Sequence, residues 1–197
     1  RFEKGAAGAR NSCLDIAQGR YIAFLDADDV WSPKKLEKQI QHMQKTGSCF
    51  SVTHYDVMDE SGRIRHEVMT PKAITFSLMM YSNFIPCLTA VYDSLALGKV
   101  PQPNIKKRND YALWLTLFRN IGCDKATSVP ENLASYRQNN YGLSSSGRDA
   151  LFFYFICLRK YAGRALLPSL YFSFIYLAIV LIKKQFPKIY NYIVIRF

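Results

Sequence analysis

Residues 21–31 read Tyr21-Ile22-Ala23-Phe24-Leu25-Asp26-Ala27-Asp28-Asp29-Val30-Trp31. The run begins with apolar, aromatic and β-branched residues, a composition that is typical of a buried β-strand. It then ends in three carboxylates within four positions, and a bound cation would relieve their mutual repulsion. Because oxygen ligands favour hard divalent ions, the stretch predicts a Mg²⁺ or Mn²⁺ site that holds a phosphorylated substrate.

The sequence on either side narrows this interpretation. An Ala-Arg-Asn segment lies at 9–11, and Pro33-Lys34-Lys35-Leu36-Glu37-Lys38-Gln39 follows the stretch. The order ARN, AxGxYIAFLDADDxW and PxKLExQ closely resembles the family 2 glycosyltransferases. The resemblance implies a GT-A fold, an N-terminally incomplete chain, and a "DXD" element that binds a metal ion and a sugar nucleotide. Within that element, Asp28 would contact the metal and Asp26 would approach the ribose or a metal-bound water. Asp29 would be either a further metal ligand or the cap of the following helix.

A second candidate segment is Arg108-Asn109-Asp110-Tyr111-Ala112-Leu113-Trp114-Leu115. It resembles the family's acidic "ED…LW" segment, in which the second carboxylate is the catalytic base, although Asn109 replaces the first acid here. The resemblance therefore implies that Asp110 removes the proton of the acceptor hydroxyl, which is a poor nucleophile until then. The local alternative is that Asn109 caps a helix and Asp110 only interacts favourably with its dipole.

Two arginines are further candidates for binding the donor, again by resemblance. Arg10 matches a family position near the nucleotide, and Tyr136-Arg137 with Ser144-Ser145-Ser146 resembles a segment that covers the diphosphate. The local alternatives are a structural arginine near the start of a helix and a flexible polar connection. The expected donor-binding set is therefore Arg10, Asp26, Asp28 and Arg137.

Hydrophobic periodicity predicts strands interleaved with helices, which is the pattern of an α/β sandwich. Ser32 and Pro33 are expected to begin a helix that has Leu36, Ile40 and Met43 inward and ends at Gly47. The expected strands are 21–25, 50–57, 63–68, 85–92 and 133–137, with a turn at 59–62. The other expected helices are 10–18, 74–81 and 109–120, the last with Leu113, Trp114 and Leu117 inward.

The bulk composition limits the partners of the chain. A net charge of +11 over 197 residues is spread out, and no nucleic-acid-binding pattern accompanies it, which argues against nucleic acid. Anionic lipid headgroups and sugar diphosphates explain the charge equally well. Five irregularly spaced cysteines without a CxxC pair argue against a zinc site or a disulfide scaffold, and they suit a reducing cytoplasm.

The C-terminal region differs in character, so we expect a glycosyltransferase domain at 1–148 and a helical region at 149–197. Residues 165–182 carry no charge, and Arg164 and Lys183-Lys184 bracket them. This length is at the short limit for crossing a bilayer. The aromatic content and flanking bases favour a helix that lies in the headgroup region. A helix packed on the domain or on a second subunit is the alternative.

These observations predict a metal-dependent, inverting glycosyltransferase that uses a UDP-hexose-type donor and a lipid-linked saccharide acceptor. The resemblance implies a role in bacterial surface-polysaccharide synthesis, in the cytoplasm and peripheral on the cytoplasmic face of the plasma membrane. Two alternatives remain. A haloacid dehalogenase-like phosphatase would use Asp26 and Asp28 as its nucleophile loop, but the sequence contains no downstream GDxxxD-type segment. A non-enzymatic, basic membrane-surface protein would leave the three carboxylates unexplained.

Overall fold

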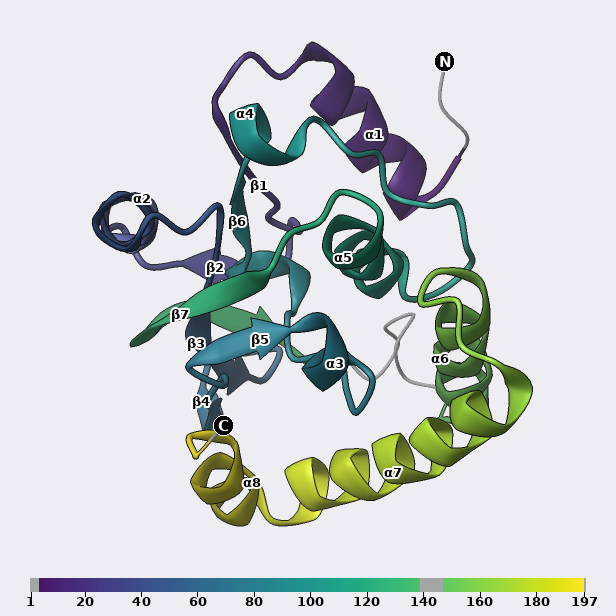
Figure 1. Cartoon of the computed structure of the whole chain (residues 1–197). Coiled ribbons are helices and arrows are strands. Elements are labelled where there is room, and N and C mark those ends of the chain that lie inside the picture. The colour runs from purple at the N-terminus through teal and green to yellow at the C-terminus, as the bar shows by residue number, and fades with distance from the viewer. Residues whose placement is uncertain (1–3, 139–146, 197) are drawn as a thin grey trace.

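The computed structural model describes residues 4–138 and 147–196. Within this part, one mixed β-sheet runs through the molecule with helices on both sides (Figure 1). The strands are β1 (Tyr21–Ala23), β2 (Val30–Trp31), β3 (Phe50–Met58), β4 (Ile64–Val68), β5 (Ala73–Thr75), β6 (Val91–Asp93) and β7 (Lys125–Arg137). The helices are α1 (Ala6–Ile16), α2 (Lys35–Thr46), α3 (Phe76–Met79), the 3₁₀ turn η1 (Cys87–Thr89), α4 (Ser94–Leu97), α5 (Asn109–Arg119), α6 (Gly147–Lys160), α7 (Leu166–Gln185) and α8 (Pro187–Val194). The predicted α/β sandwich is confirmed.

The sheet has the order β1–β6–β3–β7–β2, with β4 added to β3 and β5 added to β7. Its centre is the parallel pair β3 and β7, which runs from Ser51 opposite Thr127 to Met58 opposite Arg137. Since parallel strands end at the same edge, Met58 and Arg137 lie side by side at that edge. The short strand β2 pairs with β7 close to that edge, so the carboxylates that precede it lie there too.

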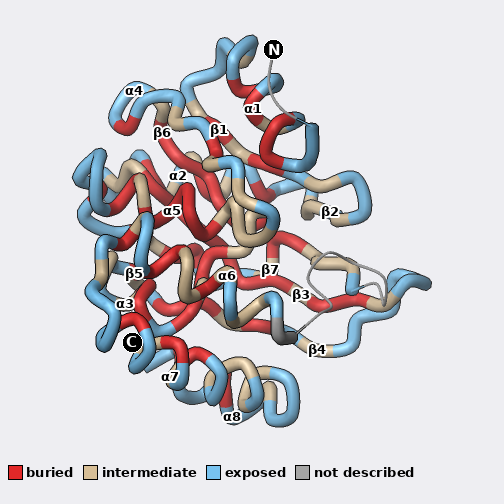
Figure 2. Tube along the Cα trace, turned by 90° about the vertical axis from the view of Figure 1, so that its right-hand side faces the viewer, coloured by how far each residue is buried: buried red, intermediate tan, exposed pale blue. Residues whose placement is uncertain are grey.

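The core on one side of the sheet is built around α5. Trp114 is fully buried, with its ring 5.2 Å from that of Phe50 and 6.4 Å from that of Phe24. Its indole N–H donates to the carbonyl of Ile85 at 2.8 Å, so the large ring is buried without an unsatisfied donor. Leu113 and Leu117 are also fully buried, as predicted. Figure 2 shows that the buried residues concentrate in the strands and in α5.

Helix α2 lies on the other side of the sheet and differs from its prediction at the N-terminal end. It begins at Lys35 rather than at Ser32 or Pro33, because Ser32 still donates its N–H to the carbonyl of Leu133 in β7. The inward residues are consequently Lys35, Gln39 and Met43, and Leu36 is 41% exposed. The predicted end is confirmed, since Gly47 closes the helix with a left-handed φ of 67°.

Three other segments differ from the sequence-based expectation. Residues 74–81 form the end of β5 and the short helix α3, and residues 133–137 are the end of the much longer β7. Residues 85–92 form η1 and then β6 instead of one strand. Residues 85–92 do not form one strand because two indole N–H groups donate to carbonyls of this segment. Trp114 donates to the carbonyl of Ile85, and Trp31 donates to that of Leu88 at 2.7 Å. Those carbonyls are therefore bonded to side chains instead of to a strand ladder.

Lys35 is unusual because it is fully buried and its ammonium has no hydrogen-bond partner among the described residues. The nitrogen lies 4.1 Å from the ring centroid of Trp31, whose negative face offsets part of the cost of burial. Burial lowers the pKa of Lys35 from its usual 10.5 to about 7. This lysine therefore costs stability whenever it carries its charge.

We expect Lys35→Met to stabilise the fold at and below neutral pH. In the native chain Lys35 titrates near 7, and in the unfolded chain near 10.5. The unfolded state thus binds more protons between these values, so this group makes the free energy of unfolding rise from about pH 7 to about pH 10. Urea unfolding at several pH values should show that the variant lacks this part of the rise. Lys34→Met, at an exposed neighbour, is the matched control. An unchanged pH slope in the Lys35 variant would contradict the assignment.

Tyrosines connect the C-terminal helices to the start of α5. The ring of Tyr154 on α6 stacks 5.2 Å from that of Tyr111 and 4.0 Å from that of Tyr176 on α7. Arg108, which precedes α5, lies 5.5 Å from the ring of Tyr154 and 4.8 Å from the ring of Tyr176. Helices α6 and α7 therefore pack directly behind the N-terminus of α5. The domain boundary at residue 148 stays a prediction.

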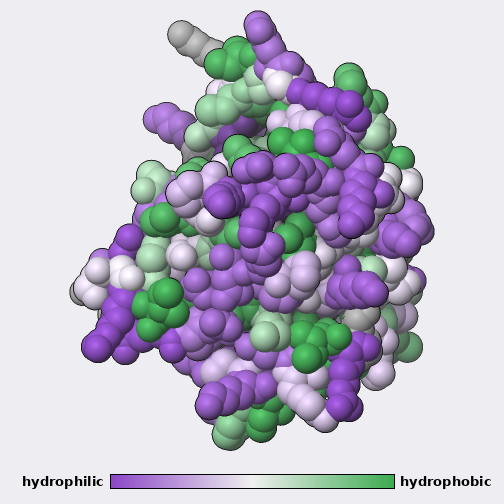
Figure 3. All heavy atoms as spheres, turned by 90° about the vertical axis from the view of Figure 1, so that its left-hand side faces the viewer, coloured by the Kyte–Doolittle hydropathy of each residue, from purple (hydrophilic) through white to green (hydrophobic). Residues whose placement is uncertain are grey.

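Helix α7 presents many of its large apolar side chains outward. Its buried residues are Ser169, Ser173 and Tyr176, while Leu167 is 76% and Phe174 is 75% exposed. By length and composition the helix could cross a membrane, and only 17% of its most apolar 18-residue stretch is buried. By contrast, the face that carries α2 is mostly hydrophilic (Figure 3). In a water-soluble domain the helix would be expected to face the other way.

Candidate functional site

The three carboxylates lie on a loop between β1 and β2, which we call the carboxylate loop (Asp26–Asp29). Strand β1 ends at Ala23, and the buried side chain of Phe24 packs beside Trp114, which fixes where the loop begins. The N–H of Asp29 donates to the carbonyl of Asp26 at 3.1 Å, so the loop closes as a tight turn. The turn brings the three acidic side chains close together.

Asp29 is held by the end of β7. Its Oδ1 accepts the backbone N–H of Arg137 at 2.9 Å. The pKa of Asp29 is raised to about 6: burial is the main cause, the negative charges of Asp28 and Asp26 add to it, and the hydrogen bond from Arg137 opposes it. The predicted alternative role of Asp29 as a helix cap is wrong, because α2 begins six residues later with Lys34 as its N-cap.

Arg137 joins the carboxylate loop to the turn between β3 and β4. Its Nε donates to the carbonyl of Asp28 at 2.9 Å, and its Nη1 donates to the carbonyls of Asp59 at 3.1 Å and Glu60 at 2.9 Å. The side chain of Arg137 thus links the backbone of the carboxylate loop to the backbone of the β3–β4 turn. Its predicted contact with the donor stays a prediction, and Ser144, Ser145 and Ser146 lie outside the described residues.

Arg10 lies on α1 and reaches the other end of the carboxylate loop. Its Nη2 donates to Oδ1 of Asp26, and its Nη1 donates to Oε1 of Gln102 at 3.2 Å. Burial lowers the pKa of Arg10, but Cys87, Asp26 and Asp110 raise it, so that it lies above the usual value. Arg10 therefore lies beside Asp26, and its predicted contact with the nucleotide stays a prediction.

Asp110 lies in the first turn of α5, where its Oδ2 accepts a hydrogen bond from the amide of Asn83 at 3.1 Å. Asp110 and Asp26 raise the pKa of the buried Cys87 thiol as well as that of Arg10, although burial is the main cause of the Cys87 shift. Residues 26 and 110 are 84 positions apart, and the fold brings both close to Arg10. The two carboxylates thus share one site.

The capping alternative for Asn109 is wrong. The N-cap of α5 is Arg108, which has a left-handed φ of 65°, and Asn109 is already helical. The amide of Asn109 turns backward and donates to the carbonyls of Pro103, at 3.2 Å, and Ile105. It therefore holds the preceding loop against the helix and leaves Asp110 as the acid of the segment.

The sequence did not reveal three residues of the site: Asn83, Cys87 and Gln102. Gln102 also forms two hydrogen bonds with the side chain of Asn11. The backbone N–H of Gln102 donates to Oδ1 of Asn11 at 2.7 Å, and Nδ2 of Asn11 donates to the carbonyl of Gln102 at 3.0 Å. This pairing gives the asparagine of the ARN segment a structural task, which is to fix the loop before α5 against α1. None of the three stands in a pattern that could have indicated its place.

The site could hold a divalent ion only with help from a substrate. Among the described residues, no group of three or more His, Cys, Asp or Glu side chains is placed to hold a metal. The pKa of Asp29 is raised mainly by burial, and the neighbouring charges of Asp28 and Asp26 contribute to the rise. These residues fit an ion bound by Asp28 and Asp26, with the remaining ligands from substrate phosphate oxygens and water, as Mg²⁺ commonly takes them.

An α/β sandwich with a carboxylate loop after one strand, and a second carboxylate on a neighbouring core helix, is the arrangement of the GT-A class of nucleotide-sugar-binding proteins. A family model described as glycosyl transferase family 2 matches residues 1–96. Residues 1–96 therefore carry the family 2 glycosyltransferase domain.

Named relatives and solved structures agree with this assignment. The chain is 40% identical over 143 residues to TuaG of Bacillus subtilis, a glycosyltransferase assigned to teichuronic acid biosynthesis, and the match covers 72% of this chain and 56% of TuaG. It is 36% identical over 145 residues to WfgD of Escherichia coli, named UDP-Glc:alpha-D-GlcNAc-diphosphoundecaprenol beta-1,3-glucosyltransferase, with 74% and 56% covered. The chain thus spans about half the length of these relatives.

The fold is similar to that of S. aureus TarS residues 1–349 in complex with UDP-GlcNAc. The TM-score is 0.59 at 16% sequence identity, and the match covers 79% of this chain and 46% of that one. At this identity the likeness supports the GT-A fold alone.

Proposed function

We propose that the intact protein is an inverting glycosyltransferase that moves a sugar from a nucleoside-diphosphate donor to a lipid-linked glycan in bacterial surface-polysaccharide synthesis. The observation that carries the proposal is the position of Arg10, which is bonded to Asp26 and electrostatically coupled to Asp110. One acidic group near the donor and a second at the start of a core helix are what this transfer requires.

In the proposed reaction Asp110 takes the proton of the acceptor hydroxyl as its oxygen attacks the anomeric carbon of the donor. The new glycosidic bond forms as the bond from that carbon to the diphosphate breaks. This single displacement inverts the configuration. Asn83 orients the carboxylate through one oxygen, and the adjoining buried residues Tyr111 and Trp114 restrict water behind the base.

On the donor side, Asp28 and Asp26 would hold Mn²⁺ or Mg²⁺, which when bound neutralises the charge of the diphosphate leaving group. Arg10 orients Asp26, and Arg137 fixes the backbone of Asp28 from the opposite side. The loop is therefore anchored at both ends before substrate arrives. Such preorganisation lowers the cost of binding a charged donor.

UDP-hexose is the proposed donor, and the acceptor is proposed to be membrane-bound. The name of WfgD specifies UDP-Glc and a diphosphoundecaprenol-linked acceptor, which supports the same substrate classes here. The outward apolar face of α7 supports peripheral binding to the cytoplasmic face of the plasma membrane, because such a surface gains free energy by entering the lipid interface. Nucleotide sugars would reach the site from the cytoplasm.

An assay of the intact protein with a panel of UDP-sugars and a diphosphoprenol-linked acceptor tests the proposal. We expect metal-dependent glycan extension with the anomeric configuration opposite to that of the donor, read by NMR of the product. A retained configuration would contradict the inverting mechanism. Hydrolysis of sugar phosphates without transfer would favour the phosphatase. Neither reaction nor nucleotide binding would favour a non-enzymatic surface protein.

A further inference from the structure

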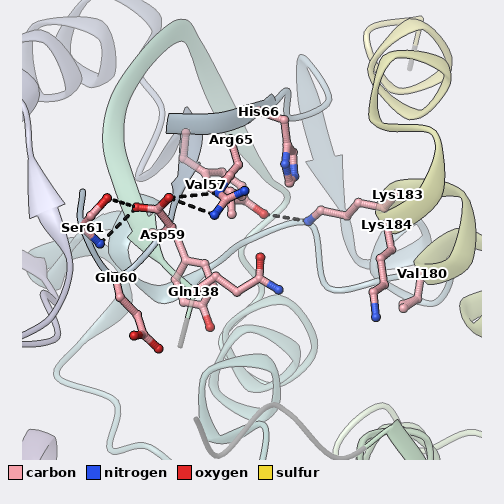
Figure 4. Close-up of a pocket in the computed structure, with 12 residues that line it drawn as sticks. Val57, Asp59, Glu60, Ser61, Arg65, His66, Gln138, Val180, Lys183 and Lys184 are labelled. Carbon is pink, nitrogen blue, oxygen red and sulfur yellow. Dashed lines mark hydrogen bonds and ion pairs between the residues drawn. The ribbon is translucent and has the colours of Figure 1, made fainter. Parts of the chain in front are cut away.

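A pocket of about 840 Å³ opens on the side of the sheet that faces the end of α7 (Figure 4). It lies between the β3–β4 hairpin, the end of β7 and the last turn of α7. Its hairpin lining includes Tyr55, Arg65 and His66, and α7 contributes Val180, Lys183 and Lys184. None of these residues belongs to the donor site described above.

Two lysines give this pocket its capacity for an anion. Arg65 is paired with Asp59 at 3.0 Å, so those two charges offset each other. Lys183 extends from α7 toward the hairpin and donates to the hydroxyl of Tyr55 at 2.6 Å. Lys184 is exposed and forms no ion pair within the described ranges. Against these two positive charges the lining sets only Glu60.

His66 adds a titratable donor on the same side. Burial lowers the pKa of His66, and the nearby charge of Lys183 lowers it further. Both effects favour the neutral form of the ring. A bound phosphate would offset the charge of Lys183 and would remove that part of the shift.

The pocket begins where the apolar face of α7 ends. Phe174, Leu177 and Leu181 are exposed on the preceding turns, and Val180 already lines the pocket. Beyond it, α8 exposes Ile189 and Tyr192. If this apolar surface lies in a membrane interface, then Lys183 and Lys184 lie at the depth of lipid headgroups, where long basic side chains extend toward phosphate.

The pocket is also joined to the carboxylate loop. Tyr136 and Gln138 line it, and the residue between them is Arg137, which bonds the carbonyls of Asp28 on one side and of Asp59 and Glu60 on the other. A headgroup in the pocket would thus lie one side chain away from the loop that receives the donor.

We infer that this pocket binds the phosphate or diphosphate headgroup of a lipid lying in the membrane on which α7 rests. The inference rests on the proposed function, because it supplies a place for the anionic part of a lipid-linked acceptor. The lysines provide the charge, Tyr55 and His66 stand beside them, and the adjoining helix provides the apolar contact for the chain of the lipid.

Sedimentation of the intact protein with three kinds of vesicle tests this inference: phosphatidylcholine alone, with undecaprenyl diphosphate, and with phosphatidylglycerol. We expect anionic vesicles to bind more tightly, and Lys183→Gln/Lys184→Gln to weaken this binding by at least about tenfold, since each basic residue at the surface contributes on the order of fivefold. Lys184→Gln alone avoids the contact with Tyr55 and should give part of the loss. Lys188→Gln, an exposed lysine outside the pocket lining, is the matched control.

The outcomes separate the sources of phosphate. Tighter binding of the diphosphate vesicles, competed by inorganic pyrophosphate, would assign the lipid-linked headgroup. Equal binding of both anionic vesicles with the same lysine dependence would assign an ordinary phospholipid. Unchanged binding of the double variant, or an equal loss in Lys188→Gln, would overturn the inference. Calorimetry of UDP binding to the same proteins tests the donor site independently. Absence of UDP binding would contradict the proposed function, whereas the vesicle results test the pocket.

Discussion

Asp110→Asn is expected to abolish most sugar transfer in the intact protein while leaving the affinity for the donor near its native value. The substitution keeps the shape of the side chain and an oxygen that can accept the bond from Asn83. It removes the ability to take a proton, and general-base catalysis contributes about 10²–10⁴-fold to the rate. Initial rates with a UDP-sugar and a lipid-linked acceptor measure the loss, and calorimetry with UDP measures donor binding.

Two comparisons make the Asp110 result specific. Asp15→Asn removes an exposed acid from α1 and should leave transfer unchanged. Asn83→Ala should lower turnover less than Asp110→Asn, because it removes the group that orients the base and leaves the base itself. Near-native turnover of Asp110→Asn would contradict the catalytic role and would indicate that Asp110 only interacts favourably with the dipole of α5.

Asp28→Asn is expected to remove the effect of Mn²⁺ on donor binding. Replacing one anionic ligand by a neutral amide of almost the same shape weakens a site for a hard cation. Removing even an outer partner of a metal ligand typically costs about 10–100-fold in metal affinity, so the loss here should be at least about tenfold. Calorimetry with UDP, with and without Mn²⁺, gives the comparison.

Asp29→Asn is the matched variant for Asp28. An amide oxygen at residue 29 can still accept the N–H of Arg137, and the change removes a carboxylate whose pKa is raised to about 6. We therefore expect the fold and the effect of Mn²⁺ to persist. If the effect is lost in Asp29→Asn and kept in Asp28→Asn, the metal ligand is Asp29.

The candidate site was predictable from the sequence where its residues are neighbours in the chain. The run from Tyr21 to Asp29 carries both the buried strand and the charge, and Asp110 opens an amphipathic helix whose apolar stripe is clear. The links between these parts were not predictable, because Asn83 and Gln102 act through contacts over 27 and 91 residues. Such contacts depend on tertiary packing and leave no periodic signal.

Side-chain direction was equally hidden at Lys35 and along α7. Leu36 was expected inward, because an apolar stripe is the usual guide to the buried face of a helix, and this guide gave no sign that Lys35 would be buried. The start of α2 is instead displaced by the pairing of Ser32 with β7. In α7 an almost uncharged sequence offers no polar face, so periodicity could not indicate that the serines would point inward.

Because serines occupy the inner side of α7, the solubility of the protein and its thermal stability depend on different side chains of this helix. Ser169 and Ser173 donate to carbonyls four residues earlier in their own helix, at 2.8 and 2.7 Å. Because Leu167 and Phe174 remain in water whether the chain is folded or not, they add little to the free energy of unfolding. They do favour self-association at high concentration. Polar substitutions of Leu167 and Phe174 would therefore improve solubility during purification at almost no cost in thermal stability.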